Sequence, residues 1–543
     1  MAVQTASTSN GRNIYEELKA KPSTIISPSF LKSQSKSYED VLSEPLISDI
    51  HTVSSYNWLA SDKASDGSNT PIIQVPGAPP LVTFPDTERL QLSPDSGHHF
   101  IDQNAARMNR RGMIPGLAAC HVYRRKFNVQ DYDIITDRNN LMKLFELLQS
   151  NEPPHNEVDD SIQLSRVPLG PGSRRGSWRG RGAPRGASGE GFSRQPTFPP
   201  RASARGRGGR PRGRARGGHF EAIPAMSRRP ESTRIDVDVV SGYDHEKGTY
   251  IYDPDSASQT LILTRWEPLD EEIIYPERDF RGFGFGFLRA TRDFLSVDAD
   301  ENVVKRDADE VTGFHCLVEY NLLGKRILVR YHADGADMDV KQFVNWSVGR
   351  GLRDLNDDDE GEEDDLDEED EDETDTFDLL DAFSTLKVAE DKPQKASKED
   401  VVGEKHDLQV PKETVRTSLP DIPLEIVHTP NFAFPHSRLL QVKTRGKYAG
   451  LDREKLHLQL FFSQTTRAYI AYHTRGNFPR TDAMQEDIGN DLKAWGEKNA
   501  TVLGGLTELL GKVKEAVAGI GGKGAILVSA EEAEAGLAVH QRR

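Results

Sequence analysis

The sequence predicts an α+β fold, in which helices flank a mixed β-sheet and long disordered insertions interrupt one core. Three observations predict it. Segments rich in β-branched and aromatic residues alternate with segments of helical spacing. Hydrophobic residues make up only 36% of the 543 residues, so part of the chain lacks the apolar surface that folding requires. Two runs of opposite charge separate the segments that can fold.

The expected strands and helices follow one another along the chain. By length and residue type, strands are expected at 260–266, 314–321, 325–333, 438–444 and 468–473. The second and third of these strands are joined by Leu322, Leu323 and Gly324, which suits a hairpin because glycine adopts a positive φ easily. By their spacing of apolar residues, helices are expected at 139–148, 287–294 and 453–463. We expect these elements to form one sheet with helices beside it.

The domain organisation follows from these blocks. Residues 51–480 are predicted to form a single core, interrupted by disordered segments at 151–233 and 352–420. Such insertions are compatible with one core, because each doubling of loop length costs only about 0.6 kcal/mol of closure entropy. Residues 1–50 are predicted to be a disordered N-terminal segment. Residues 481–543 are predicted to be a helical C-terminal tail, since leucines recur there at helical spacing.

The formal net charge of −17 conceals two opposite runs. Residues 171–218 hold 13 Arg, 13 Gly and one acid, whereas residues 357–381 hold 18 acids and no base. Guanidinium groups spaced by glycine pair with phosphates and stack on bases, so the first run predicts an RNA-binding arm. The alternatives for this first run are a solvated linker or an arm that binds acidic protein surfaces, including this chain's own acidic run. The acidic run itself is predicted to be disordered. The candidate RNA contacts in the arm are Arg205, Arg207, Arg210, Arg212 and Arg214.

Composition also limits the cell compartments in which this protein is expected. No stretch approaches the roughly 20 consecutive apolar residues of a membrane span, and the first residues lack the apolar centre of a secretory signal. Cys120 and Cys316 are too few for a disulfide framework or a four-thiolate zinc site. We therefore predict a protein of the nucleus and/or cytoplasm with reduced thiols and no membrane partner.

An acid and a lysine are predicted to end neighbouring strands. Asp334 follows the strand at 325–333, and Lys443 lies in the strand at 438–444. Because alternate residues share a face, His332 is expected beside Asp334, and Gln441 beside Lys443. This layout resembles that of the PD-(D/E)XK nucleases, in which carboxylates hold divalent metals and the lysine helps to polarise the attacking water. The alternative is an aspartate at a turn and a lysine whose stem covers apolar surface.

Five collinear stretches resemble motifs of the DXO-type decapping nucleases. They are residues 133–144, 284–289, 332–334, 440–444 and 459–472. The resemblance implies a nuclease-like core in which Arg138 faces phosphate and Asp334, Lys443 and Gln459 are the catalytic candidates. Upstream material is similar to a fungal branch related to these nucleases, and is predicted either to line an RNA channel or to be a strand pair with its connector. It comprises residues 55–59, 72–80 and 100–107.

The chain departs from the family at the metal ligands. Where the resemblance implies glutamates, this sequence has Leu288, His332 and Gln441, so Asp334 is the one acid left. Asp334 and His332 are the candidate ligands for Mg²⁺ or Mn²⁺, which prefer several oxygen donors. Glu319, Asp337 and Asp339 are expected to replace the missing acids only if the backbone differs from the family's.

Three functions remain open from the sequence. The first is an RNA-binding protein with a degenerate metal site that binds RNA 5′ ends. The second is an active, metal-dependent hydrolase of RNA 5′ ends. The third is a non-catalytic scaffold or regulatory partner of an exonuclease or another RNA-processing protein.

Overall fold

The computed structural model describes most of the chain outside its two charged runs. The described residues are 12–19, 21–26, 45–60, 64–65, 67–108, 111–124, 126–151, 233–277, 280–298, 301–307, 311–348, 413–419, 421–528 and 537–543. The Arg/Gly arm and the acidic run lie outside the described residues, as do the predicted contacts Arg205, Arg207, Arg210, Arg212 and Arg214.

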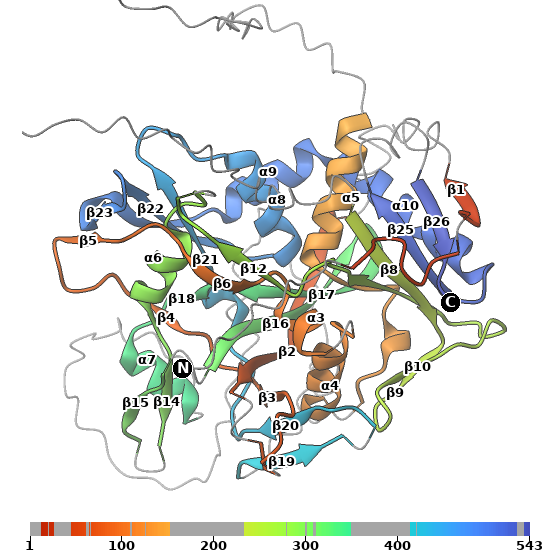
Figure 1. Ribbon diagram of the computed structural model, residues 1–543, viewed down its shortest axis with the longest axis horizontal. Helices are drawn as coiled ribbons and strands as arrows, with labels where there is room; N and C mark the ends of the chain where they lie inside the picture. Colours follow the sequence, from red (N-terminus) through yellow and green to blue (C-terminus); the bar gives the residue numbers. More distant parts are fainter. Residues whose placement is uncertain are drawn as a thin grey trace, which may run out of the picture. The chain divides into compact units, whose positions relative to one another are not determined.

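The described residues form a twelve-stranded mixed sheet (Figure 1). Its order is β1 (Thr24–Ile26), β26 (Leu537–Gln541), β25 (Lys523–Val528), β8 (Thr233–Val240), β11 (Thr260–Arg265), β7 (Ile134–Asp137), β17 (Lys325–Ala333), β16 (Val311–Leu322), β2 (Ile47–Leu59), β3 (Ile72–Val75), β20 (Glu425–His428) and β19 (Val415–Ser418). β7 runs parallel to both β11 and β17, and β20 runs parallel to β3, while the other pairs are antiparallel.

A second, six-stranded sheet carries the predicted lysine strand. Its order is β13 (Arg292–Asp293), β4 (Leu81–Val82), β18 (Gly335–Ala336), β21 (Leu439–Gly446), β22 (Arg467–His473) and β24 (Ala483–Asp487). Four two-stranded pairs complete the described strands: β9 (Gly242–Asp244) with β10 (Thr249–Ile251), β6 (Gly97–Phe100) with β12 (Glu271–Ile274), β14 (Leu295–Val297) with β15 (Val303–Lys305), and β5 (Arg89–Gln91) with β23 (Asn477–Pro479).

Helices pack against the two sheets, and they lie on both faces of the large one. They are α3 (Gln103–Arg107), α4 (Ile114–Tyr123), α5 (Arg138–Asn151), α6 (Gly284–Thr291), α7 (Val340–Ser347), α8 (Arg453–Ser463), α9 (Gly489–Lys498) and α10 (Ala500–Ala518), with single 3₁₀ turns at Val129–Asp131, His436–Arg438 and Arg480–Asp482. Buried side chains of α5, α8, α9 and α10 form one apolar cluster with the sheet, and those of α4 form another. No described helix is long and apolar enough to cross a membrane.

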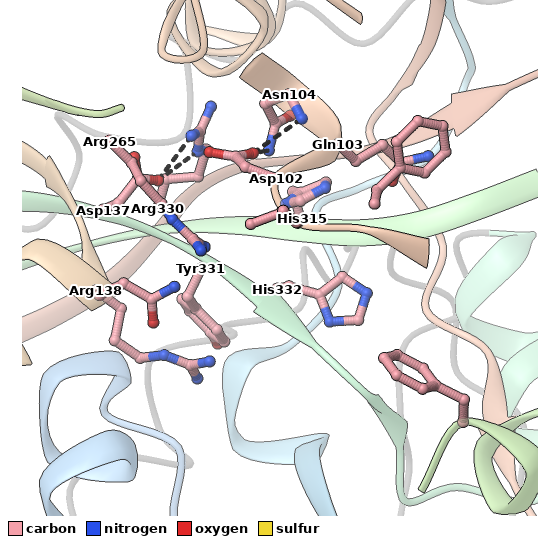
Figure 2. Close-up of a pocket in the computed structure, with 14 residues that line it drawn as sticks. Asp102, Gln103, Asn104, Asp137, Arg138, Arg265, His315, Arg330, Tyr331 and His332 are labelled. Atoms are coloured by element: carbon pink, nitrogen blue, oxygen red, sulfur yellow. Dashed lines mark hydrogen bonds and ion pairs between the residues drawn. The ribbon is translucent and has the colours of Figure 1, made fainter. Parts of the chain in front are cut away.

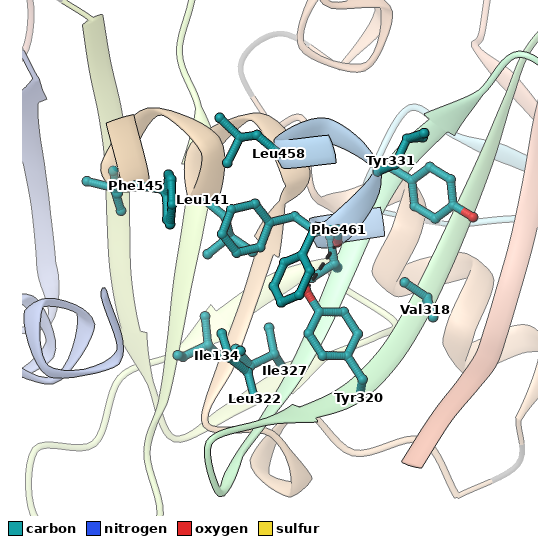
Figure 3. Packing of buried hydrophobic residues seen from close by; sticks show 14 of the residues in the cluster. Ile134, Leu141, Phe145, Val318, Tyr320, Leu322, Ile327, Tyr331, Leu458 and Phe461 are labelled. Atoms are coloured by element: carbon teal, nitrogen blue, oxygen red, sulfur yellow. Dashed lines mark hydrogen bonds between the residues drawn. The ribbon is translucent and has the colours of Figure 1, made fainter. Parts of the chain in front are cut away.

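The larger cluster fixes α5 and α8 against the sheet (Figure 3). Phe145 of α5 packs 5.3 Å from Trp495 of α9, and Phe461 of α8 packs 5.1 Å from the same indole, measured between ring centroids. Tyr320 of β16 donates its hydroxyl to the carbonyl of Phe462 at 3.1 Å. These contacts hold the first residue of α5 and the polar face of α8 near the ends of β7 and β17.

The predicted fold class is confirmed, and the predicted hairpin has the expected turn. Leu323 and Gly324 both have positive φ, 50° and 74°, as a two-residue turn that matches strand twist requires. The expected helix at 287–294 begins and ends three residues earlier, because Arg292 and Asp293 leave it to form β13.

The expectation of one sheet was wrong. β17 and β21 belong to different sheets, which meet where the chain passes from β17 through Asp334 into β18. Gly335 and Ala336 of β18 pair antiparallel with Leu440 and Leu439 of β21. The predicted acid therefore occupies the junction between the two sheets.

The segments at both ends of the sequence contribute strands to the large sheet. Within residues 1–50, β1 pairs with β26, and β2 begins at Ile47. Within residues 481–543, α9 and α10 are helical as expected, but β25 and β26 then extend the sheet beside β8. The hydrophobic residues of this segment thus pack into the main core.

Candidate functional site

The junction between the two sheets holds the carboxyl group of Asp334. Its Oδ1 accepts a hydrogen bond from Nη2 of Arg292 at 2.6 Å, and its Oδ2 accepts one from the backbone N–H of Val442 at 2.9 Å. The residue is only 5% exposed. Both carboxylate oxygens are therefore already engaged, one of them by a cation.

His332 lies beside this carboxylate, as alternation along β17 predicted. Its Nδ1 is 3.6 Å from Oδ1 of Asp334, and its ring meets the edge of His315 at 5.5 Å between centroids. Burial lowers the pKa of His332 to about 4, and the guanidinium groups of Arg292 and Arg138 act in the same direction against the attraction of Asp334. His332 is thus a neutral imidazole at pH 7.

Arg138 faces the same junction from the start of α5. It directly follows β7, and its Nη1 donates to Oε1 of Gln441 at 3.1 Å. Its guanidinium carbon lies 5.6 Å from the ring centroid of Tyr331. Burial lowers the pKa of Arg138 to about 10, so the group stays charged at pH 7.

Lys443 and Gln459, two of the catalytic candidates that the resemblance implied, are in contact. Nζ of Lys443 on β21 donates to Oε1 of Gln459 on α8 at 2.5 Å. The pKa of Lys443 is lowered to about 8, mainly by burial and also by the charges of Arg138 and Arg445, against the attraction of Asp334. The ammonium group is therefore poised to lose its charge just above neutral pH.

The donor set does not fit a divalent metal. Leu288 packs in an apolar cluster with Phe283 and Phe287, and the amide oxygen of Gln441 is taken by Arg138. Within the part of the chain that the structure describes, no three His, Cys, Asp or Glu side chains are grouped closely enough to hold a metal ion. Since both oxygens of Asp334 accept hydrogen bonds, no residue here supplies the several free oxygen donors that Mg²⁺ or Mn²⁺ requires.

The other acids near the junction have partners elsewhere. Glu319 accepts from Tyr132 and Arg326 and lies four residues along β16 from His315. Asp337 pairs with Arg467, and Asp339 caps α7 through the backbone N–H of Gln342. None of them replaces the missing glutamates.

A cavity of about 270 Å³ opens beside the junction (Figure 2). Arg138, Tyr331 and His332 line it together with His315. A second buried set, which includes the ion pair of Asp137 and Arg330 at 2.7 Å, completes its polar wall. Phe100 and Phe285 add two aromatic rings.

The structure brings the candidates Arg138, Asp334, Lys443 and Gln459 to one junction, and it adds Arg292, which the sequence did not single out. The signal for Arg292 was weak, because it stands four residues after Leu288 at the end of a helix and outside every motif. Sequence reasoning also missed Phe100 and Phe285 as cavity residues, although residues 100–107 were predicted either to line a channel or to form a connector. Phe100–Asn104 do line the cavity, whereas residues 55–59 and 72–75 form the strand pair of β2 and β3.

One family model and several solved structures match this chain. A model described as "Domain of unknown function (DUF8563)" matches residues 39–166. No match was found among the curated proteins.

Several solved structures of Rai1, a member of the DXO/Rai1 decapping nuclease family that the five stretches resemble, are similar to this chain. S. pombe Rai1 in complex with 3′-FADP matches with a TM-score of 0.36 and 10% identity, covering 93% of this chain and 98% of that chain. Scheffersomyces stipitis Rai1 in complex with (3′-NADP)+ and calcium ion matches with a TM-score of 0.37 and 9% identity, covering 91% and 88%.

Proposed function

We propose that this protein binds the phosphorylated 5′ ends of RNA without hydrolysing them through a divalent metal. The observation that carries the proposal is the cationic junction, by which we mean Arg138, Arg292 and Lys443 around the carboxylate of Asp334. Three cations face one acid, so the junction has an excess of positive charge in a buried setting.

This excess suits a phosphate group. In a site shielded from water, an uncompensated cation is costly, and an anion that pairs with it recovers much of the lost hydration energy. Arginine presents paired N–H donors to phosphate oxygens, and Lys443 adds a compact positive charge. Gln441 and Gln459 are neutral acceptors that orient Arg138 and Lys443 without neutralising them.

The same geometry argues against hydrolysis assisted by Mg²⁺ or Mn²⁺. A metal ion at Asp334 would have to displace Arg292 from a 2.6 Å ion pair, and among the described residues no group of three possible ligand side chains is there to hold it. Such a metal is also the usual source of the activated water in this chemistry. The proposal therefore assigns binding to Arg138, Lys443 and Gln459, and gives Asp334 a positioning role toward Arg292 and Val442.

The sequence supports RNA as the molecule that carries the bound phosphate. The Arg/Gly arm at 171–218 offers sequence-independent affinity through phosphate pairing, and the five stretches resemble a family that acts on RNA 5′ ends. A nuclear or cytoplasmic location and a partnership with an RNA-processing enzyme such as an exonuclease remain parts of this proposal. Cys120 and Cys316 are buried and free, which agrees with a reducing compartment.

The test compares 5′-triphosphate RNA with 5′-hydroxyl RNA of the same sequence, using the full chain. We expect tighter binding of the triphosphate form, unchanged by EDTA and weakened by added salt. We expect no phosphate release when Mn²⁺ or Mg²⁺ is titrated in. Lys443→Met is expected to weaken binding, whereas Lys447→Met, which removes an exposed lysine paired with Asp482 just beyond β21, serves as the control.

Two results would overturn the proposal. Phosphate release that depends on Mn²⁺ and disappears in Asp334→Ala would establish the hydrolase alternative. Equal affinity for the two RNA forms, or no RNA binding at all, would leave the scaffold alternative.

A further inference from the structure

The cavity beside the cationic junction has two chemically different ends. Its inner end is made of buried polar groups, and its mouth carries exposed aromatic rings. A volume of about 270 Å³ is at the lower edge of the usual size of a ligand pocket, roughly 300–1,000 Å³. The cavity therefore has room for one small unit of a polymer and not for a continuous strand.

The guanidinium groups at the inner end are not equivalent. Arg330 pairs with Asp137 at 2.7 Å, and Arg265 pairs with Glu267 at 2.5 Å. Arg138, only 8% exposed, has no carboxylate partner within ion-pair distance among the described residues, since its one hydrogen bond goes to the neutral amide of Gln441. An anion that reaches the inner end is therefore attracted to Arg138.

The mouth offers two aromatic platforms on separate elements. Phe100 ends β6 and Phe285 lies in the first turn of α6, and each remains 45% exposed. The ring of Phe285 stacks on His99 at 4.0 Å, and the guanidinium of Arg107 lies 5.8 Å from the ring of Phe100. Both rings are supported by a neighbouring side chain while keeping part of their surface in solvent, as platforms for base stacking do.

We infer that this cavity takes the terminal nucleotide of a phosphorylated RNA end, with its phosphate at Arg138 and its base stacked on Phe100 and Phe285. The inference rests on the proposed function and adds to it the unit that is recognised. Because every base has a π-face, stacking at the mouth tolerates any base. Asp137 and Arg330, which line the cavity as a 2.7 Å ion pair and are 7% and 2% exposed, leave no exposed path beyond them, so we expect an RNA end and not an internal position to enter.

The experiment separates the base from the phosphate by using two small probes on the full chain. AMP carries both groups, whereas ribose 5-phosphate carries the phosphate and the sugar alone. We expect AMP to bind more tightly, and Phe285→Ala to reduce its affinity by about 5- to 150-fold, the range for loss of one stacked base. Phe285→Trp is expected to retain AMP affinity. Phe432→Leu, at an equally exposed phenylalanine outside the cavity lining (42% exposed), is the control.

The outcomes distinguish this inference from the proposed function. If ribose 5-phosphate binds as tightly as AMP, and Phe285→Ala changes neither affinity, the stacking site is refuted while phosphate binding stands. If Phe285→Ala weakens both probes equally, the ring supports the fold of the site and does not stack on a base, which also refutes the inference. If neither probe nor 5′-phosphorylated RNA binds, the proposed function fails as well.

Discussion

Asp334→Asn separates phosphate binding from metal-dependent hydrolysis, because the two predict effects of opposite sign. If the junction binds phosphate, the carboxylate of Asp334 competes with the ligand for Arg138, Arg292 and Lys443, and its neutralisation tightens binding. If Asp334 holds a catalytic metal, the same substitution abolishes activity and weakens metal-dependent binding.

The geometry gives the expected magnitudes. Asparagine keeps one acceptor oxygen but loses the charge that now meets Arg292 at 2.6 Å, so unfolding should become easier by about 1.5–3 kcal/mol, the range for hydrogen bonds to charged groups. For an assumed separation of about 6 Å between a unit charge and a phosphate, the interaction is worth roughly 3 kcal/mol at an effective dielectric of about 20. Screening by salt reduces this value, and we expect binding to tighten about 10-fold.

The assay is the anisotropy of labelled 5′-triphosphate RNA in EDTA, run beside thermal unfolding of the same samples. Glu319→Gln is the matched control, since Glu319 is also a buried acid paired with arginine but lies along β16 away from the cavity. We expect Glu319→Gln to lose stability without a change in affinity. Weaker RNA binding by a folded Asp334→Asn protein would refute the account of the junction given above.

Three further predictions concern Lys443, α5 and the acidic run. Because the pKa of Lys443 is lowered to about 8, its positive charge is present below that pH and lost above it. The affinity for RNA should therefore be about 10-fold lower at about pH 9 than at pH 7. Lys443→Met should remove this dependence on pH. Leu141→Ala, at a fully buried position of α5, should lower the free energy of unfolding by about 2–5 kcal/mol in denaturant titration; a smaller loss would mean that α5 is not fixed as Figure 3 shows. Deleting the acidic run at 357–381, which lies outside the described residues, should tighten RNA binding if that run competes for the Arg/Gly arm, and unchanged affinity would show that the two runs are independent.

Several strands and helices of the core were predictable because their apolar pattern matches their buried face in the structure. The segments at 325–333 and 453–463 match β17 and α8 residue for residue, since both combine a clear apolar pattern with distinct ends. α8 begins after Asp452, whose side chain accepts from the backbone N–H of Lys455, which is a capping signal visible in the sequence. Local chemistry was sufficient in these segments.

The arrangement of the sheets was not predictable from local chemistry. The separation of β17 from β21 depends on Asp334, whose backbone N–H donates to the carbonyl of Leu440 at 3.2 Å while its side chain turns to Arg292 and Val442. The contacts of Asp334 with Leu440 and Val442 join residues more than a hundred positions apart, and its contact with Arg292 spans 42 positions. No spacing rule reports any of them. For the same reason, the sequence predicted which residues would meet at the site and missed Arg292, the cation that completes it.

The position of β25 in the large sheet has a consequence for how the chain is made. β8 pairs with β11 on one side and with β25 on the other, and β25 follows α10 in the sequence. During synthesis, the edge of β8 that pairs with β25 therefore stays unpaired until the ribosome has translated the whole chain between β8 and β25. An open edge invites pairing with another chain, and such distant pairing closes slowly. A shortened chain that ends before β25 should consequently aggregate, even though every residue of the cationic junction would still be present.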